Sequence, residues 1–129
     1  MKRSVAGIVR KGELLLVAHR LPGGSLGGKW EFPGGKVDAG ENDRQAIARE
    51  FREEFAVEAE AGELLATAEF EHAGCSVALS AYSVTMSSFE LTLAEHSEWR
   101  WARIEEIVRM DFADSDLKLI SQLQERLGL

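Results

Sequence analysis

The feature that most constrains this chain is a group of three glutamates, Glu50, Glu53 and Glu54, spaced i, i+3 and i+4. An α-helix turns about 100° per residue, so the three carboxylates share one helix face. Like charges packed side by side repel one another, and a cation among them removes that repulsion. The pattern predicts a helix whose acidic face binds a hard divalent ion through oxygen ligands.

The helix that carries these glutamates is predicted to end near Phe55. Asn42 or Asp43 can cap its start, and Asn42 with Gln45 three residues later resembles a capping box. The apolar residues of the segment repeat at helical spacing and form one stripe: Ile47, Ala48, Phe51 and Phe55. The helix can therefore bury one side and hold a metal ion on its flank.

The rest of the chain alternates between strand-like and loop-like segments. Strands are predicted at residues 4–9, 14–19, 30–32, 57–71, 75–86 and 98–102. A glycine-rich loop at 21–29 and turns at 10–13, 33–35 and 37–41 separate the first of them. One or two helical turns are predicted at 104–109, and an amphipathic helix at 115–127. This order predicts an α/β fold, an α/β/α sandwich around a mixed sheet, formed by one domain spanning 1–129.

Composition narrows the possible partners. A formal net charge of −7 repels a nucleic-acid backbone, which argues against a duplex binder but not against a small phosphorylated ligand. Apolar runs stay shorter than the roughly 20 residues that span a bilayer, and residues 1–3 lead directly into a strand. The single cysteine, Cys75, is expected to be a small buried strand residue and fits a reducing cytoplasm. We expect a cytoplasmic protein without a membrane partner, as a monomer or weak homodimer.

The stretch from Gly35 to Val57 resembles the signature of the Nudix family. Its fixed positions are matched by Gly35, Glu41, Arg49, Glu50, Phe51, Glu53, Glu54 and Val57, whereas Ala56 stands where the signature has glycine. That glycine eases the helix end into the next strand, so we expect an altered turn with activity retained. Residues 29–36, the pair Glu98-Trp99 and residues 111–116 resemble the MutT-like branch of the family. The resemblance implies a Nudix-type fold.

The resemblance also implies a chemistry. Nudix enzymes use water to cleave a nucleoside diphosphate linked to another group, and a triphosphate gives a monophosphate and pyrophosphate. Divalent ions activate the water and neutralise charge, and all-oxygen ligands favour Mg²⁺ or Mn²⁺ over Zn²⁺. By similarity the metal ligands are the Gly34 carbonyl, Glu50, Glu53, Glu54 and Glu98. One of Glu50, Glu54 and Glu98 assists deprotonation of the water.

Further roles follow by similarity, each with a simpler alternative. Arg49 is expected to orient the carboxylates through an ion pair, and Glu41 to support the loop or a water near the metal. Arg20 and Lys36 are candidate phosphate contacts that could equally be surface cations. Glu98 could be an ordinary exposed strand residue. The glutamate-rich helix face could likewise be an ordinary solvated surface without a metal. The three histidines (His19, His72 and His96) lack metal-ligand spacing and are expected to be structural or exposed.

Base recognition is predicted at Asp116, which matches the branch residue that reads the base edge just before the final helix. An ionised carboxylate only accepts hydrogen bonds, so it favours a base edge with an amino group and resembles the cytidine-type enzymes. A protonated, buried aspartate could also donate a hydrogen bond, and it could therefore bind oxidised guanine instead. The alternative is that Asp114, Ser115 or Asp116 only caps the last helix. Glu31 is expected to face the nucleoside, and Phe32, ahead of Phe70 and Tyr82, to stack on the base.

Three functions are compatible with the sequence. The first is Mg²⁺-dependent hydrolysis of nucleoside triphosphates, cytidine-type or modified as in 8-oxo-dGTP, which cleans the nucleotide pool and so serves DNA repair. The second keeps the chemistry but acts on ADP-ribose, a dinucleoside polyphosphate or a capped RNA end, although those branches tend to carry extra segments. The third is a non-catalytic nucleotide-binding module, which typically loses signature acids that are all present here.

Overall fold

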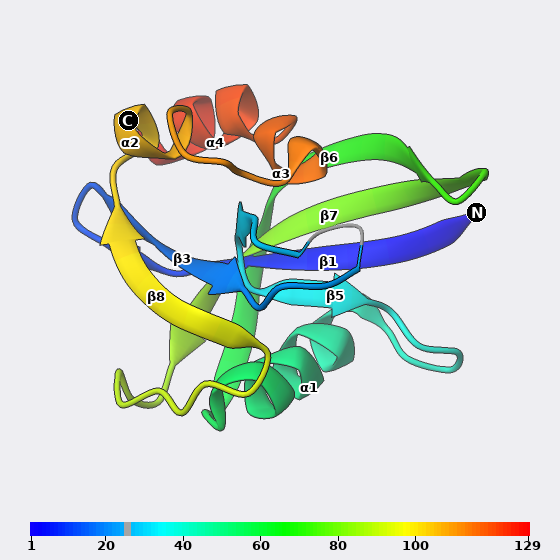
Figure 1. Ribbon diagram of the computed structural model, residues 1–129, viewed down its shortest axis with the longest axis horizontal. Helices are drawn as coiled ribbons and strands as arrows, with labels where there is room; N and C mark the ends of the chain where they lie inside the picture. Colours follow the sequence, from blue (N-terminus) through cyan, green and yellow to red (C-terminus); the bar gives the residue numbers. More distant parts are fainter. Residues whose placement is uncertain (25–26) are drawn as a thin grey trace.

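Strands form the middle of the molecule, and helices cover them from two sides. The computed structural model describes residues 1–24 and 27–129. Helix α1 (Asp43–Phe55) lies on one side of the strands, and α2 (Ile104–Ile107), α3 (Asp114–Leu117) and α4 (Ile120–Leu127) lie on the other (Figure 1). This is the α/β/α sandwich that the sequence predicts. Among the described residues, no helix is long and apolar enough to cross a membrane.

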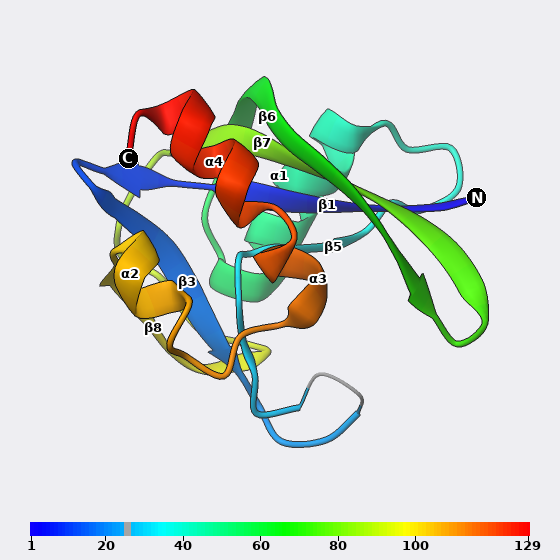
Figure 2. The same ribbon diagram turned by 90° about the horizontal axis from the view of Figure 1, so that it is seen from above.

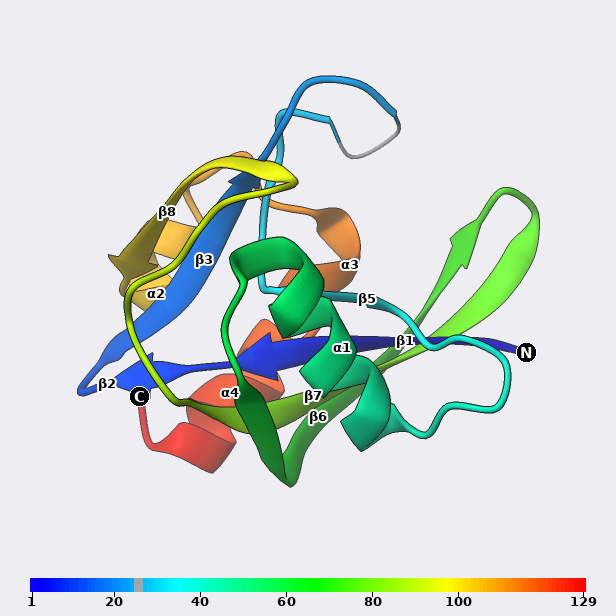
Figure 3. The ribbon, with the colours of Figure 1, turned by 90° about the horizontal axis from the view of Figure 1, so that it is seen from below.

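The larger sheet is mixed. Its order is β5 (Gly34–Lys36), β1 (Lys2–Ile8), β7 (Cys75–Met86) and β6 (Ala59–His72). Strands β1 and β7 run parallel, while β5–β1 and β6–β7 pair antiparallel. Seen from below, α1 lies in front of this sheet (Figure 3). The pairing brings β5, which carries Gly34 and Gly35, beside both the sheet centre and α1.

The second sheet is antiparallel and holds the other half of the site. Strand β3 (Leu14–Arg20) pairs with β2 (Arg10–Lys11), β4 (Trp30–Glu31) and β8 (His96–Ala102). A bulge between His19 and Arg20 shifts the register so that Arg20 pairs with His96. This places Arg20, Glu31 and His96, which are distant in sequence, on neighbouring strands.

Two hydrophobic cores fill the spaces on either side of the strands. Consecutive residues of a strand point to opposite faces, so Leu15 joins the core under the C-terminal helices while Leu16 joins the core under α1. Phe51 and Phe55 of α1 are fully buried in the second of these cores. The apolar stripe predicted for the helix is therefore the surface that packs on the sheet.

Both ends of α1 follow from local sequence. Asn42 caps its start, and the reciprocal hydrogen bonds of Asn42 with Gln45 form the capping box that the sequence predicts. Ala56 ends the helix in the left-handed conformation, with φ 54° and ψ 40°, and its N–H donates to the Arg52 carbonyl. The signature glycine is thus replaced by an alanine that adopts a backbone conformation favouring glycine.

The predicted helix at 115–127 is wrong as a single element. It is divided into α3 and α4 because the two parts are tied to different segments. Asp116 of α3 accepts a hydrogen bond from the Phe32 backbone just after β4, and Gln122 of α4 bonds to the Thr67 backbone in β6. Seen from above, α4 lies over the larger sheet and α3 beside the start of β5 (Figure 2).

Other differences are smaller. Residues 34–36 form a strand rather than a turn because their backbone pairs with β1. Strands β1 and β8 begin two residues earlier than predicted, and β6 begins two residues later. Cys75 is half-buried rather than buried because it begins β7 at the hairpin. The predicted loop at 21–29 includes residues 25 and 26, which lie outside the described residues.

Candidate active site

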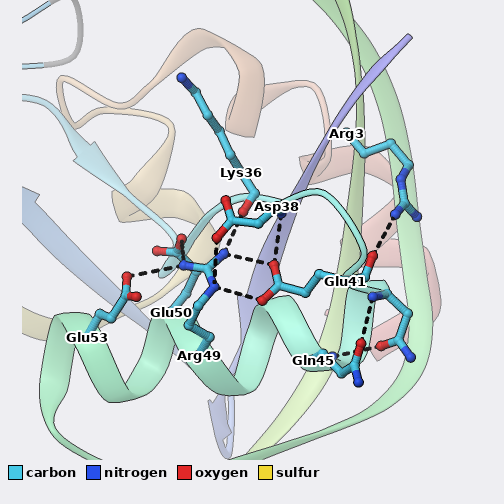
Figure 4. Close-up of polar contacts among 9 residues, drawn as sticks. Arg3, Lys36, Asp38, Glu41, Gln45, Arg49, Glu50 and Glu53 are labelled. Atoms are coloured by element: carbon cyan, nitrogen blue, oxygen red, sulfur yellow. Dashed lines mark hydrogen bonds and ion pairs between the residues drawn. The ribbon is translucent and has the colours of Figure 1, made fainter.

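Arg49 is the hub of the acidic helix face (Figure 4). Its guanidinium binds both carboxylate oxygens of Glu41, with Nε–Oε2 at 2.8 Å and Nη2–Oε1 at 3.0 Å. Nη1 donates to Glu50 at 2.8 Å and to Glu53 at 3.1 Å, and Nη2 donates to the Lys36 carbonyl at 2.8 Å. One planar cation thereby ties the helix to the loop that follows β5.

Glu41 closes that loop. Besides binding Arg49, it accepts a hydrogen bond from the Asp38 backbone N–H at 2.9 Å. These two interactions, the Arg49 hydrogen bond first, lower the pKa of Glu41 to about 2. Glu41 is therefore a fixed anion at neutral pH, and it holds Arg49 in place beside the other glutamates.

Glu50 and Glu54 are buried against the glycines of β5. The Gly34 N–H donates to Glu54 at 3.2 Å. A side chain on Gly35 would put its Cβ 2.8 Å from the Glu50 carboxylate, so glycine leaves the space that this carboxylate occupies.

Burial changes the acidity of both groups. Loss of hydration raises the pKa of Glu50. Burial, followed by the charges of Glu31 and Glu50, raises the pKa of Glu54 well above its usual range. Two buried carboxyl groups resist being ionised at the same time. A divalent cation bound by both would stabilise their ionised forms.

The acidic face fits an oxygen-preferring divalent ion in its donor chemistry. Glu53, whose side chain is 54% exposed, stands at the edge of the buried Glu50–Glu54 pair. Across residues 1–24 and 27–129, no three His, Cys, Asp or Glu side chains already surround a common point in metal-binding geometry. Arg49 Nη1 currently bridges Glu50 and Glu53, so binding of an ion there requires these carboxylates to reorient.

A cavity of about 800 Å³ is lined by this loop and by the start of α3. Gly34, Gly35, Lys36 and Glu41 line one part of it, and Phe32, Phe70, Leu79 and Asp116 line another. Arg20 and Glu31 also contribute to the wall. A volume of this size is within the usual range for small-molecule sites.

Asp116 lies buried in the wall of this cavity. Its Oδ2 accepts a hydrogen bond from the Phe32 backbone N–H at 2.9 Å. Burial, opposed by that hydrogen bond, raises the pKa of Asp116 to about 7. The helix-capping alternative is wrong for Asp116: the N-cap of α3 is Ala113, which makes no side-chain cap bond.

The three aromatic candidates have different environments. Phe32 is buried, lines the cavity and packs edge-on against Phe112, with ring centroids 5.2 Å apart. Phe70 also lines the cavity. Tyr82 is not part of the cavity wall, and its hydroxyl donates to Asp43 at 2.7 Å.

Glu98 makes no polar contact with the acidic face among the described residues. It is exposed on β8 and accepts a hydrogen bond from Arg100 at 3.0 Å. Within the described part of the chain, no hydrogen bond or ion pair joins Glu98 to Glu50, Glu53 or Glu54. The segment before β8 does reach α1, because the Ala94 N–H donates to the Glu54 carbonyl.

His96 belongs to the site region, and sequence reasoning missed it. Its buried ring contacts Glu31, with Nε2–Oε2 at 2.9 Å, and Glu31 also binds Arg20 at 3.2 Å. The sequence prediction considered only metal-ligand spacing and began the strand at residue 98. Alternation along the strand gives no signal for residue 96, because residues 98 and 100, on the same side of the alternation as buried Ala102, are exposed.

Comparison with known proteins agrees with this geometry. The family model described as the NUDIX domain matches residues 1–123. The chain belongs to the Nudix family. It is a MutT-like Nudix hydrolase, as the relatives below support.

Among its Nudix relatives, the CTP pyrophosphohydrolase of Escherichia coli (strain K12) is 36% identical over 116 residues, which cover 90% of this chain and 86% of the relative. The 8-oxo-dGTP diphosphatase of Haemophilus influenzae is 35% identical over 120 residues, which cover 92% of this chain and 88% of the relative. The solution structure of the E. coli ORF135 protein matches with a TM-score of 0.86 at 34% identity, over 97% of this chain and 89% of the other. The fold is shared with the MutT protein of Methanosarcina mazei Go1, with a TM-score of 0.87 at 23% identity. The match covers 99% of this chain and 96% of the other.

Proposed function

We propose that this Nudix hydrolase cleaves nucleoside triphosphates with water to give the monophosphate and pyrophosphate, in a Mg²⁺- or Mn²⁺-dependent reaction that removes unwanted nucleotides from the pool. The observation that carries the proposal is one cavity with two chemically different ends. One part is lined by Gly34, Gly35 and Glu41, which contact the acidic helix face, and another contains a buried carboxyl beside aromatic rings.

The acidic end suits the triphosphate. The Gly34 carbonyl, Glu50, Glu53 and Glu54 would hold the metal, with Glu98 as a further ligand if it leaves Arg100. The bound ion would neutralise the phosphate charge and promote attack by water. A carboxylate of Glu50, Glu54 or Glu98 accepts the proton of the attacking water. Arg49, which binds Glu50 and Glu53 in this structure, orients these carboxylates as they turn toward the ion. Lys36, whose side chain points away from the Arg49 cluster, is available to a phosphate (Figure 4).

The other end suits a base with an exocyclic amino group. Asp116 uses Oδ2 for the Phe32 N–H, which leaves Oδ1 to accept a hydrogen bond from a ligand. Cytosine offers its N4 amino group for that purpose. The relative named CTP pyrophosphohydrolase supports cytidine triphosphates as the first substrates to test.

Oxidised guanine is the second candidate because Asp116 has a raised pKa of about 7. Near neutral pH a large share of Asp116 is therefore a neutral acid, which can donate one hydrogen bond and accept another. That form would suit a purine edge with both a carbonyl and an N–H. The relative named 8-oxo-dGTP diphosphatase supports including this nucleotide.

The test is a substrate panel at two pH values. Pyrophosphate and phosphate release would be measured with Mg²⁺ for CTP, dCTP, 5-methyl-dCTP, 8-oxo-dGTP, ATP, ADP-ribose and diadenosine polyphosphates, at pH 6 and pH 8.5. We expect pyrophosphate release from one or two triphosphates. The rate for 8-oxo-dGTP relative to the other triphosphates should be greater at pH 6 than at pH 8.5. Asp116→Asn should abolish that dependence of base preference on pH while leaving Mg²⁺ dependence unchanged.

Other outcomes would redirect the proposal. Cleavage of ADP-ribose or a dinucleotide, without any triphosphate turnover, would keep the metal face and reject base reading by Asp116. Nucleotide binding without turnover on the whole panel would favour a non-catalytic module. Equal base preference in wild type and Asp116→Asn would show that Asp116 does not read the base.

A further inference from the structure

We infer that His96 is a positioning residue, which fixes the Glu31 carboxylate from inside the core and thereby holds the Arg20 guanidinium at the nucleotide cavity. This inference rests on the proposed function, since it concerns how that cavity receives its nucleotide. His96 itself is not part of the cavity wall, whereas Glu31 and Arg20 are.

The His96 ring is locked in place. Its side chain is 0% exposed, and it stacks on Phe55 with ring centroids 5.4 Å apart and planes 7° apart. Phe55 is the last residue of α1 and directly follows Glu54. The backbone just before His96 is also tied to the end of α1, because Thr92 and Ala94 donate to the carbonyls of Phe55 and Glu54.

The hydrogen bonds of the ring assign its tautomer. Nε2 lies 2.9 Å from Glu31 Oε2, whereas Nδ1 is the one buried side-chain polar atom in the described structure that lacks a hydrogen-bond partner. A proton on Nδ1 would be a buried donor without an acceptor, which is unfavourable. The geometry therefore assigns the proton to Nε2, which donates to Glu31.

Glu31 passes this constraint to Arg20. The same Oε2 atom that faces His96 lies 3.2 Å from Arg20 Nη1, so the carboxylate is bound on two sides. The Arg20 side chain is 33% exposed and belongs to the cavity wall. Without His96, Glu31 would be free to rotate, and Arg20 would lose the partner that aims it.

Two substitutions separate the hydrogen bond from the packing. His96→Phe keeps a flat ring against Phe55 but removes the donor, whereas His96→Gln keeps an N–H donor near the Nε2 position without the stack. We expect His96→Phe to raise KM for the best triphosphate about tenfold with kcat within about twofold, because a binding group loses its orientation. His96→Gln should restore most of the lost affinity. His19→Phe, at a half-buried histidine bonded to Ser97 and Gly28 instead, is the matched control and should leave KM unchanged.

Coupling to Arg20 distinguishes positioning from general packing. In an Arg20→Met background, His96→Phe should change KM less than about twofold, since Arg20 no longer needs aiming. Equal tenfold effects of His96→Phe with and without Arg20 would overturn the inference. A decrease in kcat alone, or a His96→Gln variant no better than His96→Phe, would overturn it as well.

A separate readout needs no turnover and no variant. Nitrogen-15 NMR of the histidine side chains in the wild-type protein reports which ring nitrogen carries the proton. We expect the Nε2–H form for His96, and an Nδ1–H form would overturn the assignment. If the wild type cleaved no nucleotide, the proposed function would fail while this measurement would still decide the state of His96.

Discussion

Replacing Asp116 with asparagine should change how the stability of the protein depends on pH. The two side chains have nearly the same shape, and the asparagine carbonyl can still accept the Phe32 N–H. The substitution removes only the ability to ionise. Asp116 is buried, so its ionisation in the folded state requires a carboxylate in an apolar environment.

The size of the effect follows from the pKa of Asp116, which rises from 3.8 to about 7 on folding. Between these values the folded protein binds more protons than the unfolded chain, so stability falls as pH rises through this window. Each pKa unit corresponds to about 1.4 kcal/mol, which gives a total loss on the order of 4 kcal/mol. Roughly 2.5 kcal/mol of this loss falls between pH 5 and pH 8.

Urea denaturation of both proteins at pH 5, 6, 7 and 8 measures the effect. The unfolding free energy of Asp116→Asn minus that of the wild type should rise by about 2.5 kcal/mol from pH 5 to pH 8. Asp114→Asn, at an exposed position of the same helix, should give a flat difference. A flat difference for Asp116→Asn would refute the raised pKa and, with it, the neutral-acid explanation for 8-oxo-dGTP.

Four further substitutions test the acidic helix, the turn that ends it and the β6–β7 hairpin. Ala56→Gly should stabilise the fold by about 1 kcal/mol in urea denaturation, because its left-handed backbone is costly for alanine; Ala73→Gly, also left-handed, should gain a similar amount. Gly35→Ala should lower kcat about 100-fold with the melting temperature nearly unchanged, because the new Cβ displaces the Glu50 carboxylate; full turnover would contradict this. Glu53→Gln should also keep the fold by circular dichroism while kcat falls about 100-fold, and unchanged kcat would remove Glu53 from the metal face.

The parts of the fold and site that could be predicted are those with local causes. The capping residues Asn42 and Gln45 and the apolar stripe of α1 depend on spacing within one helix, so the sequence was sufficient for them. The clustering of Glu50, Glu53 and Arg49 follows from the same helical geometry.

The parts that could not be predicted depend on contacts between distant segments. The division of the last helix reflects bonds from Asp116 to residue 32 and from Gln122 to residue 67, which no local pattern reveals. The burial of His96 against Glu31 depends on the bulge that pairs Arg20 with His96. Glu98, which matches a motif position, is bonded to Arg100 in this structure, so its expected role as a metal ligand stays a prediction.

The central claim is that the buried face of α1 binds the divalent ion that turnover requires. The most direct test is pyrophosphate release from CTP and 8-oxo-dGTP as a function of Mg²⁺ concentration for the wild type, Glu54→Gln and Glu58→Gln. Glu54 is 1% exposed beside Gly34, whereas Glu58 is an exposed glutamate just beyond the same helix. We predict saturable Mg²⁺ dependence for the wild type and Glu58→Gln, and a loss of about 100-fold for Glu54→Gln. Wild-type turnover by Glu54→Gln, or turnover that persists in EDTA, would contradict the account.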